Sequence, residues 1–107
     1  FPTSTGNPYG TVKVNPSAIG NQPQSTIASI MAHEIGHCIG FRHTDYMNRA
    51  YSCGGQAVNE GDGGGGAIQI PGPPSGPDPN SWMLSCIGAG QNRPFNANDV
   101  TALNYLY

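Results

Sequence analysis

The chain has very little charge. Only 9% of its 107 residues are charged, and its formal net charge at pH 7 is −2. A surface that binds nucleic acid or anionic lipid needs clustered positive charge. The four cationic residues are instead scattered along the sequence, so neither kind of partner is expected; they are Lys13, Arg42, Arg49 and Arg93.

Long apolar runs are also missing, and none approaches the roughly 20 residues that a membrane-spanning helix needs. No signal peptide precedes Phe1, and the sequence does not begin with methionine. We therefore expect a processed or excised piece of a longer protein. The chain is rich instead in glycine (16) and proline (10), which predicts long loops.

Cysteine is scarce, with three residues: Cys38, Cys53 and Cys86. An odd number in a loop-rich chain suits one disulfide and one buried thiol, because long loops need tying down. Three reduced thiols in a cytosolic protein are the alternative. The sequence does not determine the pairing, but Cys53–Cys86 is favoured because both lie in loop sequence with serine and glycine. Cys38 lies in a helical pattern.

Regular structure is predicted in three places. Residues 11–14 alternate polar and apolar side chains, which indicates a short strand. From Ser25 to Phe41 no proline interrupts a helical pattern, which Ser25 can cap. Gly40 would end this helix because it can adopt a positive φ. The apolar positions of the helix are Ile27, Ile30, Met31 and Ile35.

The chain from residue 43 to residue 82 is predicted as loop. It contains the run GDGGGG and a proline-rich stretch, and neither suits a helix or a strand. The third regular element is a helix at the C-terminus, which Asn96 or Asn98 can cap. Its predicted apolar face consists of Val100, Leu103 and Leu106.

All three histidines fall within residues 33–43. His33 and His37 are four positions apart, so a helix places both on one face, where they can bind one metal ion. A sharp turn at Gly40 would bring His43 back as a third ligand. Three protein nitrogens and a water molecule are the ligands of a catalytic zinc site rather than a structural one.

Glu34 follows the first histidine and points about 100° away from it around the helix. It is poorly placed as a ligand, but it can reach a water molecule beside the same ion and act as general base. The complete pattern is H-E-x-x-H-x-x-G-x-x-H, and no histidine lies outside it. This argues against the alternative, a helix that carries these residues by chance.

In these residues the chain resembles the metzincin zinc metallopeptidases. The stretch SWMLS, residues 81–85, is similar to the family's methionine turn, with Met83 as the methionine. The short sequences HEIGH, NRPF and TALNYLY most resemble those of secreted bacterial HEIGH-type metzincins. One departure is Ser85, because several metzincins have a tyrosine there that binds zinc or stabilises the transition state. That role is not carried over.

The resemblance implies an α+β, metzincin-like fold, in which residues 1–107 form the C-terminal part of one catalytic domain. Residues 1–43 would supply an edge strand and the zinc-binding helix. Residues 44–107 would form a loop-rich lower subdomain with the methionine turn and a C-terminal helix. A lone strand cannot satisfy its backbone groups, so the N-terminal portion of the same domain is an expected partner.

The function that the resemblance implies is a secreted, extracellular zinc endopeptidase that acts on proteins or peptides. One catalytic Zn²⁺ would be held by His33, His37 and His43, with Glu34 as general base. A catalytically silent, zinc-containing secreted binding module is the alternative, and the intact Glu34 argues against it. A metal-free, disulfide-tied secreted binding domain would not need three clustered histidines.

Substrate could pair as an added strand with residues 11–14. The loop 71–82 would wall the pocket for the residue after the scissile bond, although a core position suits Trp82 equally well. The predicted substrate-binding residues are Thr11, Val12, Lys13, Val14 and Trp82.

Oxygen ligands for Ca²⁺ gather around the sequence NEGDG. The full spacing of a calcium-binding loop is missing, so a solvated loop is the favoured interpretation. The residues concerned are Asn59, Glu60, Asp62 and Asp78.

Overall fold

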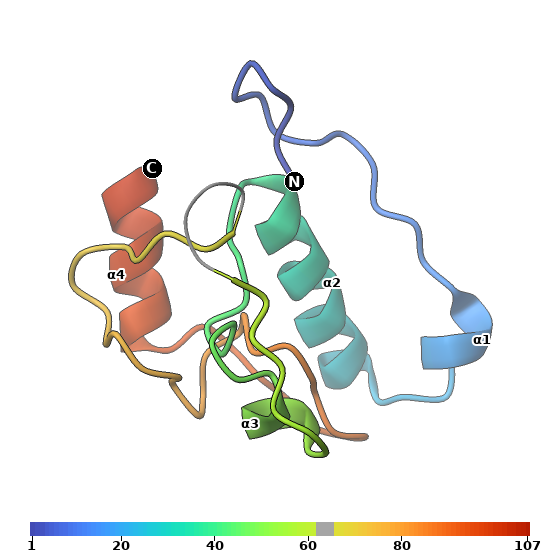
Figure 1. Ribbon diagram of the computed structural model, residues 1–107. Coiled ribbons are helices and arrows are strands. Elements are labelled where there is room, and N and C mark those ends of the chain that lie inside the picture. Colours follow the sequence, from blue (N-terminus) through green and yellow to red (C-terminus); the bar gives the residue numbers. More distant parts are fainter. Residues whose placement is uncertain (62–65) are drawn as a thin grey trace.

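The computed structural model describes residues 1–61 and 66–107, in which Figure 1 shows helices joined by long coil segments. α2 and α4 lie on either side of the coil that carries the third histidine and the methionine turn (Figure 1). Within the described residues no helix is long and apolar enough to cross a membrane. The helices are α1 (Pro16–Ile19), α2 (Gln24–Cys38), α3 (Ala50–Cys53) and α4 (Ala97–Leu106).

The predicted edge strand does not form. Residues 1–61 and 66–107 contain no β-strand, and residues 11–14 run as coil along the side of α2 that faces away from α4 (Figure 1). A strand needs a neighbour to pair its backbone N–H and C=O groups, and the described part of the chain offers none. The expected α+β fold is therefore wrong, because the described structure consists of helices and coil.

α2 begins one residue before the predicted helix. Pro23 occupies the N-cap position, and Ser25 lies inside the first turn, so the serine does not cap the helix as predicted. The single turn α3 lies in the segment that the sequence predicted as loop, and α1 lies where no regular element was predicted. In α1 the side chain of Asn15 caps the helix and a proline follows it, a local arrangement that suits a helix start.

The end of α2 turns the chain back sharply. Gly40 has a φ of 111°, which few residues other than glycine adopt. Its N–H donates to the carbonyl of His37 at 3.1 Å, and the N–H of Phe41 donates to the carbonyl of Gly36 at 2.9 Å. These two bonds form a Schellman motif. The predicted turn at Gly40 is therefore present, and it redirects the chain toward the face of α2 that carries the histidines.

The apolar faces predicted for the two long helices are only partly buried: Ile27, Ile30 and Met31 of α2 are half-buried, and Leu103 of α4 packs against the core. Ile35 of α2 is 49% exposed, and Val100 and Leu106 of α4 are each 45% exposed. The buried residues of α2 are small or polar instead: Thr26, Ser29, Gly36 and Cys38. At about 100° per residue, Thr26, Ser29 and Gly36 share a stripe that lies roughly opposite Ile27 and Ile35. This stripe contains His33, so the helix packs with its histidine-bearing side inward.

Gly36 permits a very close approach between α2 and the methionine turn, residues 81–85. A Cβ atom at this position would lie 2.6 Å from the sulfur of Met83 and 2.6 Å from the ring of Trp82. A small hydrophobic core surrounds the contact, and Met83 is only 1% exposed. The buried members of this core are Phe41, Trp82, Met83 and Ala102.

A buried carboxylate attaches α4 to the methionine turn. Asn96 caps α4, and Asp99 completes a capping box by accepting a hydrogen bond from the Asn96 N–H at 3.0 Å. Asp99 also accepts bonds from the Ser81 hydroxyl at 2.9 Å and from the Trp82 N–H at 3.1 Å. The predicted cap at Asn96 is thus correct, and it holds the turn beneath α2 as well as starting α4.

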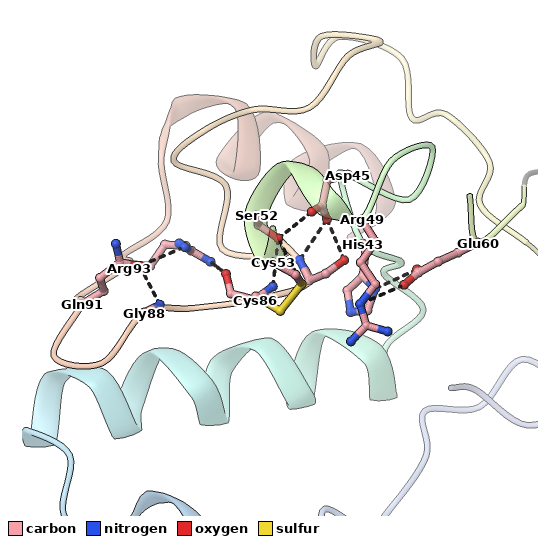
Figure 2. The surroundings of a disulfide bond; sticks show 11 residues. His43, Asp45, Arg49, Ser52, Cys53, Glu60, Cys86, Gly88, Gln91 and Arg93 are labelled. Carbon is pink, nitrogen blue, oxygen red and sulfur yellow. Dashed lines mark hydrogen bonds and ion pairs between the residues drawn. A yellow bond between two sulfur atoms is a disulfide. The ribbon is translucent and has the colours of Figure 1, made fainter. Parts of the chain in front are cut away.

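A disulfide joins Cys53 of α3 to Cys86, just after the methionine turn (Figure 2). This is the pairing that the sequence favoured, and Cys38 is a buried free thiol. Closing a loop across 33 residues would stabilise the fold by about 4 kcal/mol in the chain-entropy description.

Asp45 links this disulfide to the segment after the third histidine. It is fully buried, and it accepts a bond from the Ser52 hydroxyl at 2.6 Å (Figure 2). Its other oxygen accepts the Ser85 N–H at 2.9 Å and the Ser85 hydroxyl at 2.8 Å. Burial alone would raise the pKa of Asp45, but these hydrogen bonds outweigh it and lower that pKa. Ser85, in place of the family's tyrosine, therefore has a structural partner.

We expect Gly36→Ala to destabilise the protein by about 1–3 kcal/mol, because the new methyl group would collide with Met83 and Trp82. Alanine otherwise favours a helix by up to about 1 kcal/mol, so the sign of the effect tests the contact. Gly10→Ala is the control, since a Cβ there meets nothing within 4 Å. Urea unfolding of both variants measures the effect, and an unchanged or increased stability of Gly36→Ala would contradict the packing.

Candidate metal centre

Three imidazoles converge where α2 ends. His33 and His37 project from α2, and the Schellman turn returns the chain so that His43 faces them. One ring nitrogen of each histidine lies within 4.8 Å of the other two, and the ring centroids are 4.7 to 5.2 Å apart. No other group of three or more potential metal ligands comes together in residues 1–61 and 66–107.

Two of these rings are oriented by backbone carbonyls. The Nδ1 atom of His33 lies 3.0 Å from the carbonyl oxygen of Trp82, in the methionine turn. The Nδ1 atom of His37 lies 2.8 Å from the carbonyl oxygen of Phe41, just past the Schellman turn. A carbonyl can only accept a hydrogen bond, so each Nδ1 must carry the hydrogen. Each Nε2 is then left unprotonated and able to bind a metal.

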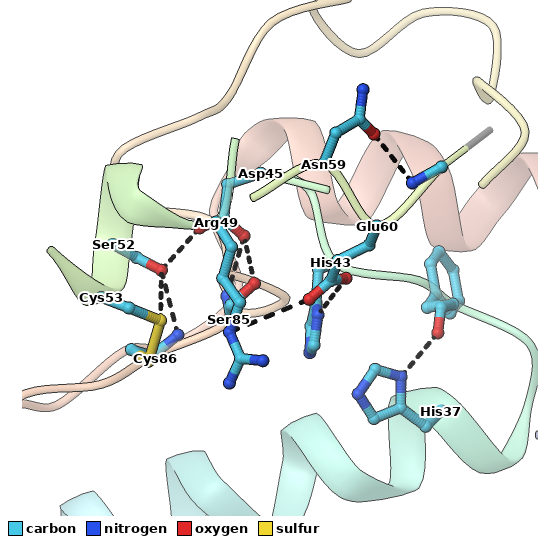
Figure 3. Close-up of polar contacts among 12 residues, drawn as sticks. His37, His43, Asp45, Arg49, Ser52, Cys53, Asn59, Glu60, Ser85 and Cys86 are labelled. Carbon is cyan, nitrogen blue, oxygen red and sulfur yellow. Dashed lines mark hydrogen bonds and ion pairs between the residues drawn. A yellow bond between two sulfur atoms is a disulfide. The ribbon is translucent and has the colours of Figure 1, made fainter. Parts of the chain in front are cut away.

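The third ring is oriented by a side chain. The Nδ1 atom of His43 lies 2.8 Å from Oε2 of Glu60 (Figure 3). A carboxylate acceptor likewise places the hydrogen on Nδ1 and leaves Nε2 for a metal. All three histidines thus have Nε2 free for a metal, although the groups that bond to their Nδ1 atoms differ.

The protonation of the two helical histidines also favours metal binding. Burial lowers the pKa of His33 and His37, and their bonds to backbone carbonyls raise it again in part. The positive charge that neighbouring histidines would carry lowers both pKa values further. Both rings are therefore neutral near pH 7, which is the form that binds metal.

This set of donors fits zinc. Zn²⁺ binds imidazole nitrogen at about 2.0–2.1 Å and prefers four ligands in a tetrahedron. His33, His37 and His43 would fill three positions and leave the fourth open. An open position is the mark of a catalytic zinc site, whereas structural sites are closed by four protein ligands.

A cavity of about 580 Å³ opens at two of the three histidines, His37 and His43. Glu34 is exposed and lines it together with His37 and His43. Of the four N-terminal residues predicted to bind substrate, Val14 does not line this cavity. The other three do, although they form no strand; they are Thr11, Val12 and Lys13.

A second cavity, of about 690 Å³, lies between α4 and residues 66–76 and also reaches His43. Trp82 is 4% exposed, and its ring meets Phe41 and Phe95 edge-on. It is thus a core residue that also contributes to the wall of this cavity. The apolar side chains of the wall include Phe41, Ala67, Ile68, Ile70, Pro71, Pro73, Pro74, Ala102 and Leu106.

The residues considered for calcium are engaged elsewhere. Asn59 accepts a hydrogen bond from the backbone two residues later, and Asp78 accepts bonds from two asparagine side chains at the start of α4. Glu60 binds His43, and Asp62 lies outside the described residues. The described residues therefore support no calcium site.

Two supporting residues were not predicted from the sequence: Asp45, which fixes the segment after His43, and Glu60, which bonds to His43. Asp45 stands two positions after His43, and this closeness in a chain with six acidic residues was an available signal. Glu60 lies 17 positions after His43, beyond any fixed motif spacing, and only the fold brings it to the site.

Comparison with known families gives a match to the family model described as dual-action HEIGH metallo-peptidase, over residues 1–107. This agrees with the resemblance seen in the sequence. No curated protein and no solved structure matches the chain.

We expect the untagged protein to retain one zinc ion per chain after dialysis, because three imidazoles converge with one ring nitrogen of each within 4.8 Å of the other two. His43→Ala should weaken zinc binding strongly, since only two ligands remain. Elemental analysis and competition with a chelator measure both effects. Protein that folds but retains no zinc would contradict the assignment of the metal ligands.

Proposed function

The chain belongs to the HEIGH metallopeptidase family, and on this premise we propose that it is a secreted zinc endopeptidase of the metzincin type. The proposal is carried by one observation: His33, His37 and His43 converge with Nε2 available, and Glu34 lines the cavity beside them. Proteins or peptides are the substrates that a peptidase of this family would cleave.

His33, His37 and His43 would hold one Zn²⁺. When bound, the ion would polarise the scissile carbonyl and make a nearby water molecule more acidic. Glu34 would accept a proton from the attacking water and then donate it to the leaving amine. The exposed position of Glu34 supports this role, because its carboxylate is accessible from the cavity.

A thiol mechanism has little support. Cys38 is buried at 9% exposure, and a nucleophilic cysteine needs a histidine to take its proton. All three histidines of the chain belong to the candidate metal centre. A metal-assisted attack by water is therefore the mechanism that these residues favour.

Secretion is supported by the disulfide between Cys53 and Cys86. Disulfides persist in oxidising compartments and are rare in the cytosol. The bond also anchors the loop that follows the third histidine, so an oxidising environment would help to keep the metal centre assembled.

The two cavities suggest how a peptide would lie. The smaller cavity is lined both by Glu34 and by residues 11–13, so main chain near the scissile bond would pass through it. The larger cavity starts at His43 and has a mainly apolar wall. We infer that it accepts a bulky apolar side chain of the substrate, because burying such a side chain gains free energy in proportion to its apolar area.

We expect Glu34→Gln to lower kcat/KM for casein-derived peptides by about 100-fold or more, because it removes the general base and leaves the ligands intact. Zinc content should stay at the parental level, which elemental analysis checks in the same preparation. Near-normal turnover in the zinc-loaded variant would exclude Glu34 as the base. Absence of hydrolysis in the zinc-loaded parent would favour a silent zinc module instead.

We expect peptides with Phe or Leu directly after the scissile bond to be cleaved with a kcat/KM about tenfold or more above peptides with Asp or Lys there, because a charge in an apolar pocket loses hydration. Matched peptides with the same substitutions three residues further along provide the control. Cleavage that is indifferent to the residue after the scissile bond would contradict the role of the larger cavity.

A further inference from the structure

The three metal-binding histidines are not supported alike. His33 and His37 stand on α2 and bond to backbone carbonyls. His43 lies on coil after the helix has ended, and its Nδ1 bonds to the carboxylate of Glu60 at 2.8 Å (Figure 3). We propose that Glu60 is a positioning residue, which holds His43 in the tautomer and orientation that bind zinc. This inference rests on the proposed function, because it requires that the histidines hold zinc.

The backbone of Glu60 is fixed against the segment that follows His43. The N–H of Glu60 donates to the carbonyl of Tyr46 at 2.8 Å, and the N–H of Arg49 donates to the carbonyl of Val58 at 2.8 Å. These two bonds hold residues 58–60 alongside residues 46–49. The carboxylate therefore reaches His43 from a defined position rather than from a free loop.

The other carboxylate oxygen of Glu60 lies near an arginine side chain. Arg49 Nε lies 3.9 Å from Oε1, while Oε2 accepts the bond from His43 (Figure 3). The side chain of Glu60 is 29% exposed and that of His43 is 19% exposed. Partial burial reduces screening of the contact by water, so the carboxylate is more than an incidental surface neighbour.

A carboxylate suits this ligand for a physical reason. A hydrogen bond to a charged acceptor is stronger than one to a backbone carbonyl, and His43 lacks the rigid helix that orients the other two rings. A carboxylate that accepts from Nδ1–H also makes Nε2 a better donor to the metal. Glu60 thus helps to orient His43, which lies on coil, whereas His33 and His37 are positioned by α2.

Zinc affinity tests the proposal directly. We expect Glu60→Ala to weaken zinc binding by about 10–100-fold, and Glu60→Gln to weaken it less, because an amide oxygen can still accept from Nδ1–H. Asn59→Ala is the control from the same loop: its side chain bonds only to the backbone of residue 61 among the described contacts. Chelator competition measures all four proteins, and thermal unfolding without zinc checks that each variant is folded.

The ¹⁵N shifts of the imidazole nitrogens report the tautomer of each histidine. A purely structural effect of Glu60 on the loop would not change the tautomer of His43. In zinc-free protein at pH 8, ¹⁵N shifts should place the hydrogen of all three histidines on Nδ1. Glu60→Ala should change the tautomer of His43 alone, with His33 and His37 as internal controls. Should Glu60→Ala not fold, Glu60→Gln carries both measurements, with a reduced zinc affinity expected.

Unchanged zinc affinity, or a loss of affinity without any change at His43, would overturn the proposal. An equal loss in Asn59→Ala would also overturn it, because loop integrity would then explain the effect. The proposed function is judged separately on the parent protein. If the parent binds zinc and cleaves peptides while Glu60→Ala behaves identically, only the positioning role fails.

Discussion

The close contact between Gly36 and the methionine turn is the constraint on which the rest of the structure depends. Without a Cβ atom at Gly36, α2 can rest on Met83 and Trp82 at a distance that no other residue allows. The carbonyl of Trp82 then reaches the ring of His33. The carbonyl of Met83 accepts the N–H of Thr44, which fixes the chain directly after the third histidine. One contact thereby aligns His33 and His43, two candidate metal ligands that come from different segments.

Local rules predicted part of this arrangement from the sequence. The histidine spacing, the turn at Gly40 and the cap at Asn96 depend on residues within about one or two helical turns, so a short stretch is sufficient to predict them. The strand at residues 11–14 could not be judged locally, because a strand exists only with a partner. The packed face of α2 was predicted only in part: Ile27 and Ile30 are half-buried, but the most buried positions belong to small or polar residues such as Gly36.

Although the chain has few charged residues, three of its carboxylates connect distant segments through hydrogen bonds. Asp99 joins α4 to the methionine turn, and Asp45 joins the turn to the disulfide loop through Ser52 and Ser85. Glu60 contacts His43 from 17 positions away. Each of these acids connects segments distant in the sequence, where the small core supplies few contacts. Glu34 differs from them, because it is exposed and lines the cavity beside His37 and His43.

In the function proposed above, His33, His37 and His43 bind one zinc ion and leave a position open for water. X-ray absorption at the zinc edge of the loaded protein tests this most directly. We expect nitrogen and oxygen neighbours at about 2.0–2.1 Å, with the outer-shell scattering of three imidazoles. Sulfur at about 2.3 Å, which would implicate Cys38, or scattering from fewer than three imidazoles would contradict it.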